Sequence, residues 1–236
     1  MKLALRYRVT AEFVGTMFLL AAVVGSGIMG ERLAGGNIAL ALLANSSATG
    51  AALIALILTF GEISGAHFNP VVTLSDAMMG GIPWSEVPAY IAAQVTGAFA
   101  GVAAAHLMFG LPVFFASHHA RSGLALFWSE FVATFGLLAV IWGCGRTRRD
   151  WVALAVGGYI AAAYWFTAST SFANPAVTLA RTVTDTFAGI RPVDAPAFIV
   201  AQVMGAIAAT LWFRALPFPK LDTPVRKREY EFNRMP

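Results

Sequence analysis

Two short motifs of matching type could present hydrogen-bond donors inside an apolar protein. Each motif opens a short apolar segment: Asn69-Pro70-Val71 in the first half of the chain and Asn174-Pro175-Ala176 in the second. Asparagine followed by proline is typical of a helix start, because the Asn side chain caps free backbone N–H groups and Pro fits the first helical position. The motifs therefore predict two short helices whose positive N-terminal ends, about half a charge each, face a shared polar space.

The elements around these motifs are those of a membrane protein. Of the 236 residues, 58% are hydrophobic and 12% are charged, whereas soluble domains are about one-quarter charged. Six apolar segments approach or reach the roughly 20 residues that a bilayer core demands: residues 11–29, 38–60, 90–109, 124–142, 151–167 and 197–213. The segments that begin at Asn69 and Asn174 reach only about ten residues, or ~15 Å, so we expect them to re-enter the membrane without spanning it.

The chain consists of two matching halves. Glu12 matches Glu130 within a shared Glu-Phe-Val sequence, and Gln94 matches Gln202 within a shared Ala-Gln-Val sequence. Each half contains three predicted spans and one short helix, and an odd number of crossings turns the second half upside down. The predicted fold is therefore an all-α membrane protein with six transmembrane helices, two re-entrant half-helices and an inverted repeat.

Basic residues predict the orientation of this bundle. With the N-terminus inside, twelve of the 16 Lys and Arg residues fall on the cytoplasmic side and four on the other. This bias predicts a multi-pass protein of the cell's inner (plasma) membrane with both termini cytoplasmic. The basic tail at residues 217–236 could anchor this orientation, which is the simpler interpretation, or bind anionic lipid. The single cysteine, Cys144, excludes an internal disulfide and a cysteine-based metal cluster.

The residues before each motif, at positions 64–68 and 169–173, are expected to be non-helical backbone at membrane depth. Such backbone is tolerated only where it lines a cavity or is buried in protein. A pore with carbonyl acceptors, Asn donors and positive helix ends repels cations and suits small neutral hydroxylated solutes. One alternative is that both asparagines only cap helices. Another is a coupled carrier, which shares inverted repeats and broken helices; nothing in the spans suits an intramembrane enzyme.

These motifs, the sequence Ser-Gly-Ala-His-Phe-Asn-Pro at residues 64–70 and the two Glu-bearing spans resemble those of the aquaporins and aquaglyceroporins, the major intrinsic protein family. The resemblance extends over residues 8–216. It implies a right-handed, aquaporin-like bundle that forms one channel domain over 1–216, with repeats at about 8–109 and 124–216. It also implies a homotetramer in membrane lipid, one pore per subunit for small neutral solutes, and no enzymatic activity, cofactor, metal or nucleic acid.

The chain departs from the family at the narrowest part of the implied pore. In most members an arginine stands three residues after the second Asn, and here that position is Val177. The family's spacing carries the other constriction positions to Thr49, Ala162 and Ser171. The register at Ala162 could slip by one, although both neighbours are also alanine. A constriction without arginine or an aromatic ring should be wider and more apolar than a water-selective filter.

The second motif and the residues after it, 174–187, are similar to a bacterial subgroup linked to arsenic resistance and often called aquaporin S. This similarity implies passage of uncharged arsenite and methylated arsenicals beside polyols, with water as a further candidate. Glycerol facilitators normally keep the filter arginine, often followed by aspartate. This chain has Val177-Thr178 there, which argues against a specialised glycerol role.

Three polar residues have a structural and a functional interpretation. The family implies that Glu12 and Glu130 each hydrogen-bond the backbone of a re-entrant loop. The alternative for these carboxylates, a proton relay, has no visible chain of partners. His67 is expected to pack against its own loop, with a gate or a metal ligand as the alternatives.

Polar residues of the predicted outer loops are also ambiguous. Arg181 lies about two turns past Asn174 and could place a cation at the outer mouth. An exposed ion pair with Asp185, four residues later, is the simpler interpretation. His118 and His119 have no partner at metal-ligand spacing, so we expect a solvated pair.

Overall fold

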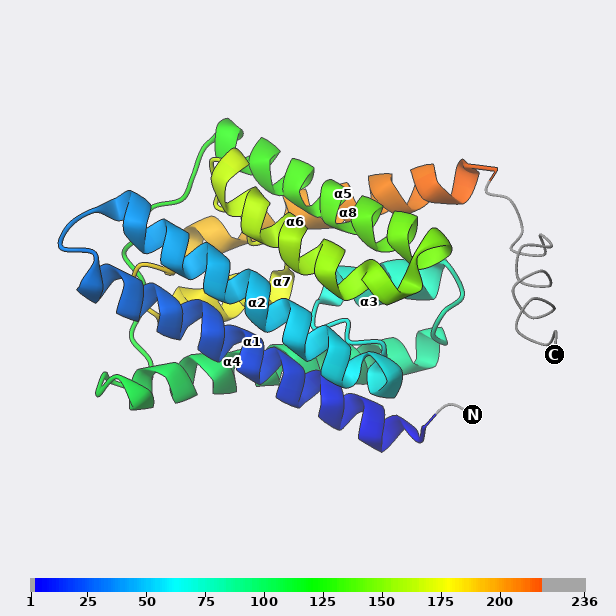
Figure 1. Ribbon diagram of the computed structural model, residues 1–236, viewed down its shortest axis with the longest axis horizontal. Helices are drawn as coiled ribbons and strands as arrows, with labels where there is room; N and C mark the ends of the chain where they lie inside the picture. Colours follow the sequence, from blue (N-terminus) through cyan, green and yellow to red (C-terminus); the bar gives the residue numbers. More distant parts are fainter. Residues whose placement is uncertain (1–2, 218–236) are drawn as a thin grey trace, which may run out of the picture.

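The computed structural model describes residues 3–217, which contain helices and no strands. The six long helices are α1 (Leu5–Leu33), α2 (Ile38–Ser64), α4 (Val87–Met108), α5 (Leu124–Thr147), α6 (Val152–Phe166) and α8 (Ala195–Ala215). Two short helices, α3 (Pro70–Met78) and α7 (Pro175–Ala180), lie among them (Figure 1). The predicted all-α fold is confirmed. Nearly all of the predicted basic tail, 217–236, lies outside the described residues.

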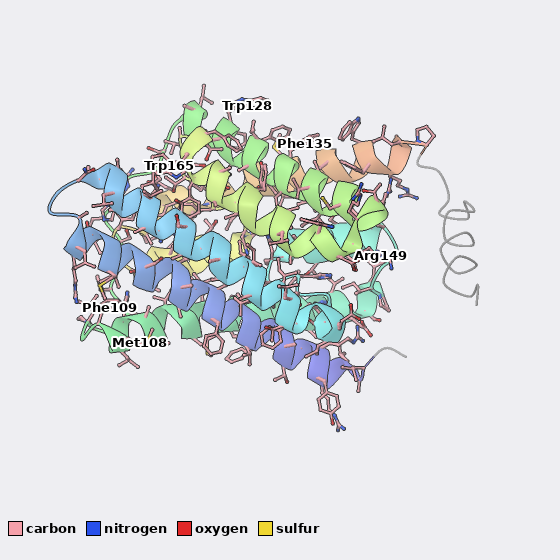
Figure 2. The ribbon with its side chains drawn as sticks, in the orientation of Figure 1. Met108, Phe109, Trp128, Phe135, Arg149 and Trp165 are labelled. Atoms are coloured by element: carbon pink, nitrogen blue, oxygen red, sulfur yellow. The ribbon has the colours of Figure 1, made fainter. Side chains whose placement is uncertain are left out.

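The long helices form a membrane-spanning bundle. Five of them, all except α6, have the length and apolar composition of a membrane span. The sixth, α6, has 15 residues and continues the short 3₁₀ helix Arg149–Trp151. Large apolar side chains cover the outside, where Trp128 is 61% exposed and Trp165 is 49% exposed (Figure 2). An apolar outer surface of this extent suits contact with lipid.

The two halves of the bundle are packed alike. Helix α1 packs against α4 in the first half, and α5 packs against α8 in the second. Gly97 on α4 meets the backbone of Phe13, and Gly205 on α8 meets the backbone of Phe131. A Cβ atom at either glycine would overlap a carbonyl oxygen, so these residues permit the close approach of the paired helices. Helices α2 and α6 join the halves by packing against each other.

The two short helices begin at the predicted motifs. The side-chain oxygens of Asn69 and Asn174 cap the first backbone N–H groups, and Pro occupies the first helical position in both helices. Helix α3 has nine residues, close to the expected length, whereas α7 has six and passes into the 3₁₀ turn Arg181–Val183. The chain leaves the α-helix there because the carbonyl oxygen of Arg181 accepts from Ile190 N, which ties it to the following loop.

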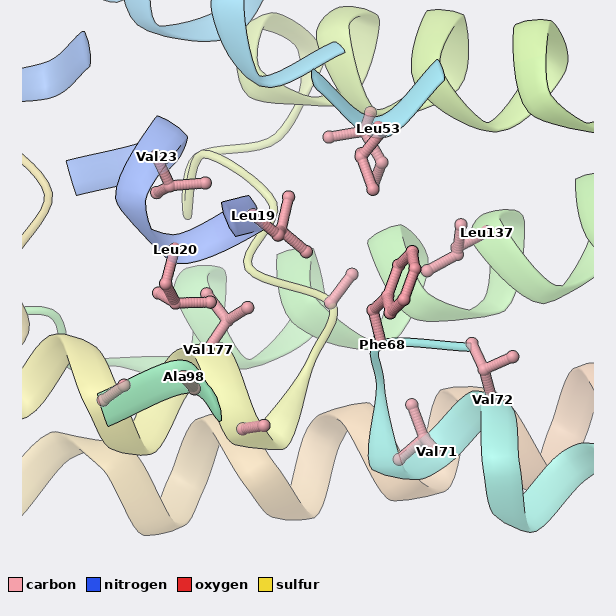
Figure 3. Close-up of a cluster of buried hydrophobic side chains, with 14 of the residues drawn as sticks. Leu19, Leu20, Val23, Leu53, Phe68, Val71, Val72, Ala98, Leu137 and Val177 are labelled. Carbon is pink, nitrogen blue, oxygen red and sulfur yellow. The ribbon is translucent and has the colours of Figure 1, made fainter. Parts of the chain in front are cut away.

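The buried core lies where the short helices meet the long ones. Val71 of α3 and Val177 of α7 pack in one cluster with Leu20 of α1 and Ala98 of α4 (Figure 3). None of these four side chains is more than 5% exposed. The core therefore holds the half-helices, and with them the loops before each Asn, at fixed positions in the bundle.

The chain enters and leaves the bundle at the same end. The start of α1 and the last turn of α8 both lie at the right-hand end of the bundle in Figure 1, as six crossings require. Arg149 lies toward that end in Figure 2, and Met108 and Phe109 lie at the opposite end. The loop after α5 and the two ends of the described chain therefore share one side of the membrane.

Candidate pore

Two buried carboxylates hold the loops that lead into the half-helices. Glu12 accepts the backbone N–H groups of His67 at 2.9 Å and Phe68 at 2.7 Å. Glu130 accepts those of Phe172 and Ala173, both at 2.9 Å. Both carboxylates have no solvent exposure. Because each one binds successive backbone donors, it fixes the course of its loop.

Matching glutamines extend these two contacts. Gln94 donates to Glu12 at 2.8 Å, and Gln202 donates to Glu130 at 2.6 Å. Each amide nitrogen also lies 2.8 Å from a threonine hydroxyl on the adjacent half-helix. The two carboxylates therefore sit in equivalent hydrogen-bond networks, one in each half of the repeat.

The loops adopt an unusual backbone that these networks stabilise. Positive φ angles occur at equivalent positions, three residues and one residue before each Asn: Ala66, Phe68, Ser171 and Ala173, with φ between 48° and 50°. A residue with a side chain is uncommon in this left-handed region and costs about 1–2 kcal/mol there. Within the described part of the chain, no protein donor meets the carbonyl oxygens of Gly65, Ala66, His67, Ser171 and Phe172.

The two motif asparagines are cross-linked by hydrogen bonds. Asn69 Nδ2 donates to the carbonyl oxygen of Ala173 at 2.8 Å, and Asn174 Nδ2 donates to that of Phe68 at 2.8 Å. Each asparagine thus binds the residue just before the other one. An amide nitrogen carries two hydrogens, so each side chain retains a second N–H group. The half-helices therefore meet with their N-termini together.

A cavity of about 550 Å³ runs through the bundle past both asparagines. It extends from Arg8 and Glu62, near the end where the chain enters, to Arg181 beyond the second motif. Its walls are mainly aliphatic side chains of the long helices, with polar groups contributed by the two loops. An apolar cavity with a few converging polar groups is typical of a small-molecule site.

Three of the four predicted constriction residues line this cavity: Thr49, Ser171 and Val177. None of them is more than 5% exposed. Ser171 Oγ is buried and has no hydrogen-bond partner among the described residues. The fourth residue, Ala162, is exposed on the outer face of α6 and does not line the cavity.

Tyr164 stands where the prediction placed Ala162. Helix α6 contributes every fourth residue to the cavity wall: Val152, Val156, Ile160 and Tyr164. The Tyr164 hydroxyl lies 3.3 Å from Thr49 Oγ1. The prediction of a small, non-aromatic residue from α6 at the cavity wall is therefore wrong, because α6 places the aromatic ring of Tyr164 there. Counting back from Asn174 crosses a non-helical loop that does not keep the helical register, whereas the four-residue spacing on α6 could have identified Tyr164.

His67 lies on the cavity wall within its own loop. Its Nδ1 is 3.1 Å from Thr73 Oγ1, and its Nε2 is 3.7 Å from Asp76 Oδ2. The ring also packs 5.5 Å from that of Tyr90, measured between ring centres. The histidine therefore joins its loop to the helix that follows it.

Arg181 is buried and has no ion pair with Asp185, so the predicted exposed pair is wrong. Its side chain is 2% exposed, lines the cavity and lies 3.4 Å above the ring of Phe172. Its Nε donates to the carbonyl oxygen of Ala188. The sequence spacing misled because the chain turns after α7, which removes the helical i, i+4 relationship with Asp185.

Asp185 instead binds the histidines of the outer loop. Its Oδ1 accepts from His118 N at 2.8 Å, and its Oδ2 lies 3.0 Å from His118 Nδ1. His119 Nε2 is 3.8 Å from the same carboxylate. The backbone hydrogen bond from His118, followed by its side chain, lowers the pKa of Asp185. The two histidines are therefore exposed to solvent, as the sequence predicted, and each also lies within 4 Å of the Asp185 carboxylate.

Arg121 fastens the same outer loop to the second half of the bundle. Its guanidinium donates to the carbonyl oxygens of Gly189 at 2.8 Å and Ser169 at 3.3 Å. It lies 5.2 Å from the ring of Phe172, on which Arg181 also packs. Burial lowers the pKa of Arg121. This role could not be predicted from the sequence, because it depends on carbonyl groups that only the fold brings together.

Two half-helices that meet at their N-termini beside a cavity, inside a bundle of six long helices, are arranged as in a transport protein built from an inverted repeat. The chain belongs to the major intrinsic protein family, which it matches over residues 2–151 and 147–229. Proteins of this family are solute channels, so the resemblance seen in the sequence is confirmed.

Individual relatives support this assignment. Aquaglyceroporin AqpS of Rhizobium meliloti (strain 1021) is 53% identical over 212 residues, which cover 90% of this chain and 91% of that protein. Aquaporin NIP1-3 of Oryza sativa subsp. japonica is 34% identical over 228 residues, which cover 93% and 76%. The X-ray structure of the aquaglyceroporin from Plasmodium falciparum matches with a TM-score of 0.71 at 20% identity, covering 90% and 97% of the two chains. This structural similarity to the Plasmodium falciparum protein supports the assignment of the fold.

Proposed function

We propose that the protein conducts small uncharged solutes passively along the cavity between Asn69 and Asn174. The observation that carries this proposal is the crossed asparagine pair on the wall of one continuous cavity. The second N–H group of each amide is available to a solute oxygen. The unpaired loop carbonyls provide acceptors on the same wall, so a solute can exchange its water for protein groups as it passes.

The proposed solutes are polyols and uncharged arsenicals, namely arsenite and methylated arsenicals, with water as a further candidate. Val177 supplies an apolar surface where most family members have a charged arginine. Around it the cavity wall is largely aliphatic, which favours solutes that carry methyl or methylene groups. The high identity to aquaglyceroporin AqpS also supports a channel that is not restricted to water.

The proposed setting is the inner (plasma) membrane, with both termini cytoplasmic and four copies of the chain in each assembly. The ends of the described chain share one side of the bundle with Arg146 in the last turn of α5 and with Arg148 and Arg149, which follow it. Basic residues near membrane spans favour the cytoplasmic side. The tetramer rests on the family assignment, and each subunit contains its own cavity.

Flux into proteoliposomes tests this proposal. Stopped-flow light scattering would compare water, glycerol and urea, and chemical analysis would follow methylated arsenicals. A passive channel gives flux that rises linearly with the solute gradient and is unaffected by a protonophore. Saturating flux that collapses with the protonophore would favour the coupled carrier instead. Liposomes without protein supply the background.

A further inference from the structure

A buried arginine lies at the outer part of the cavity, four residues beyond the position where the family usually has one. Val177 occupies the usual position, and Arg181 follows at the end of α7. Both side chains line the same cavity. The chain therefore has no cation at the usual position and holds one farther along the same short segment.

The Arg181 guanidinium uses only its Nε–H group in hydrogen bonds to the described residues. Its Nε donates to the carbonyl oxygen of Ala188, and its plane packs over the ring of Phe172 at 3.4 Å. Among the described residues, no acceptor meets Nη1 or Nη2. A guanidinium carries four N–H bonds on these two nitrogens, so Arg181 has fixed donors without protein partners.

A second polar group without a partner lies on the same wall. Ser171 precedes Phe172, lines the cavity and is 3% exposed. Its Oγ has no hydrogen-bond partner among the described residues. A buried hydroxyl without a partner is unfavourable, which calls for an explanation such as a transient ligand.

We propose that Arg181 and Ser171 form a solute-recognition site at the outer end of the path, with Arg181 as a specificity-determining residue. The site takes small neutral solutes that combine a hydrogen-bond-accepting oxygen with an apolar part. The oxygen meets the free guanidinium donors and the serine hydroxyl, and the apolar part contacts Val177. This inference rests on the proposed function, because it assumes that solutes travel along this cavity.

The proposal separates larger solutes from water. A solute that fills the path must give up its water at once and depends on wall donors for compensation. Water molecules that move in a file keep hydrogen bonds to one another, so loss of one wall donor affects them less. Removing Arg181 or Ser171 should therefore change the ratio of solute flux to water flux, not only the total.

The test compares glycerol, urea and water flux in proteoliposomes that contain equal amounts of assembled protein. Arg181→Met keeps the length of the side chain and removes its donors. We expect it to lower glycerol and urea permeability about tenfold, a barrier change of ~1.4 kcal/mol, and water permeability less than threefold. The matched control is Arg191→Gln, because Arg191 pairs with Asp194 and does not line the cavity.

A second variant keeps the test decisive if Arg181→Met does not assemble. Ser171→Ala removes a hydroxyl that has no partner, and alanine already occupies the left-handed backbone at Ala66 and Ala173. It should fold as the wild type does and lower glycerol and urea permeability severalfold relative to water. Wild-type flux with an unchanged solute-to-water ratio in the assembled variants overturns this inference and leaves the proposed function standing. Absence of any solute or water flux through the wild type overturns both.

Discussion

Thr49 and Tyr164 face each other at the cavity wall, with 3.3 Å between their hydroxyl oxygens. The contact joins α2 of the first half to α6 of the second and places an aromatic ring beside a predicted constriction residue. Ala162, two residues earlier, lies on the outer face of the same helix. Substitutions at Thr49 and Ala162 therefore test which face of α6 borders the cavity.

Bulky substitutions should distinguish the inner face of the bundle from its outer face. Thr49→Trp places a large ring in the cavity beside Tyr164, so we expect glycerol and urea flux to fall to the liposome background. Ala162→Trp places the same ring on the outer face and should leave flux near the wild-type value. Stopped-flow measurements on both assembled variants provide the check. Equal loss in the two variants would contradict this assignment of faces.

Introducing arginine at Val177 should exclude the larger solutes. The new guanidinium would occupy space beside the path and remove apolar wall, while still offering donors to water. We expect Val177→Arg to lower the flux of glycerol and methylated arsenicals about tenfold relative to water, equivalent to ~1.4 kcal/mol in a barrier. Val177→Leu, which adds bulk without charge, is the matched control. If water and larger solutes decline in equal proportion, Val177 does not determine selectivity.

Neutralising Glu12 should loosen the first re-entrant loop. Its carboxylate accepts the backbone N–H groups of His67 and Phe68. In Glu12→Gln the side-chain NH₂ group replaces one of these acceptor oxygens, so at least one backbone N–H group would face another donor. Losing one such buried contact costs about 1–3 kcal/mol, so the thermal unfolding temperature in detergent should fall measurably. Glu31→Gln, an exposed position on the same helix, should leave it unchanged. Equal behaviour of the two variants would argue against the role assigned to Glu12.

Acid should weaken the outer loop through Asp185. Hydrogen bonds from His118 lower the pKa of this carboxyl below its unfolded value of 3.8. A carboxyl whose pKa is lower in the folded state stabilises that state above the unfolded pKa. The contribution is lost as pH falls through the folded pKa. Thermal unfolding followed from pH 5 to pH 3 should therefore show a steeper loss for the wild type than for Asp185→Asn. Parallel curves would show that the contact contributes nothing.

The sequence predicted those parts of the site that depend on local chemistry. The two Asn-Pro motifs identified both helix starts, and the matching of Glu12 with Glu130 indicated the repeat. The predictions were wrong where two residues are separated by non-helical backbone, because helical spacing does not apply across it. The loop before Asn174 broke the register that led to Ala162, and the turn after α7 separated Arg181 from Asp185. The burial of Arg181 depends on Phe172 and Ala188, which the fold brings to it.

The central claim is that solutes pass between Asn69 and Asn174, and glycerol flux through Asn174→Leu tests it most directly. Leucine has nearly the shape of asparagine but removes the donor to Phe68 and the second N–H group on the cavity wall. Light scattering from proteoliposomes, with assembly verified by size-exclusion chromatography, should show glycerol flux close to that of liposomes without protein. Wild-type glycerol flux through a correctly assembled Asn174→Leu protein would contradict the claim and place the path elsewhere.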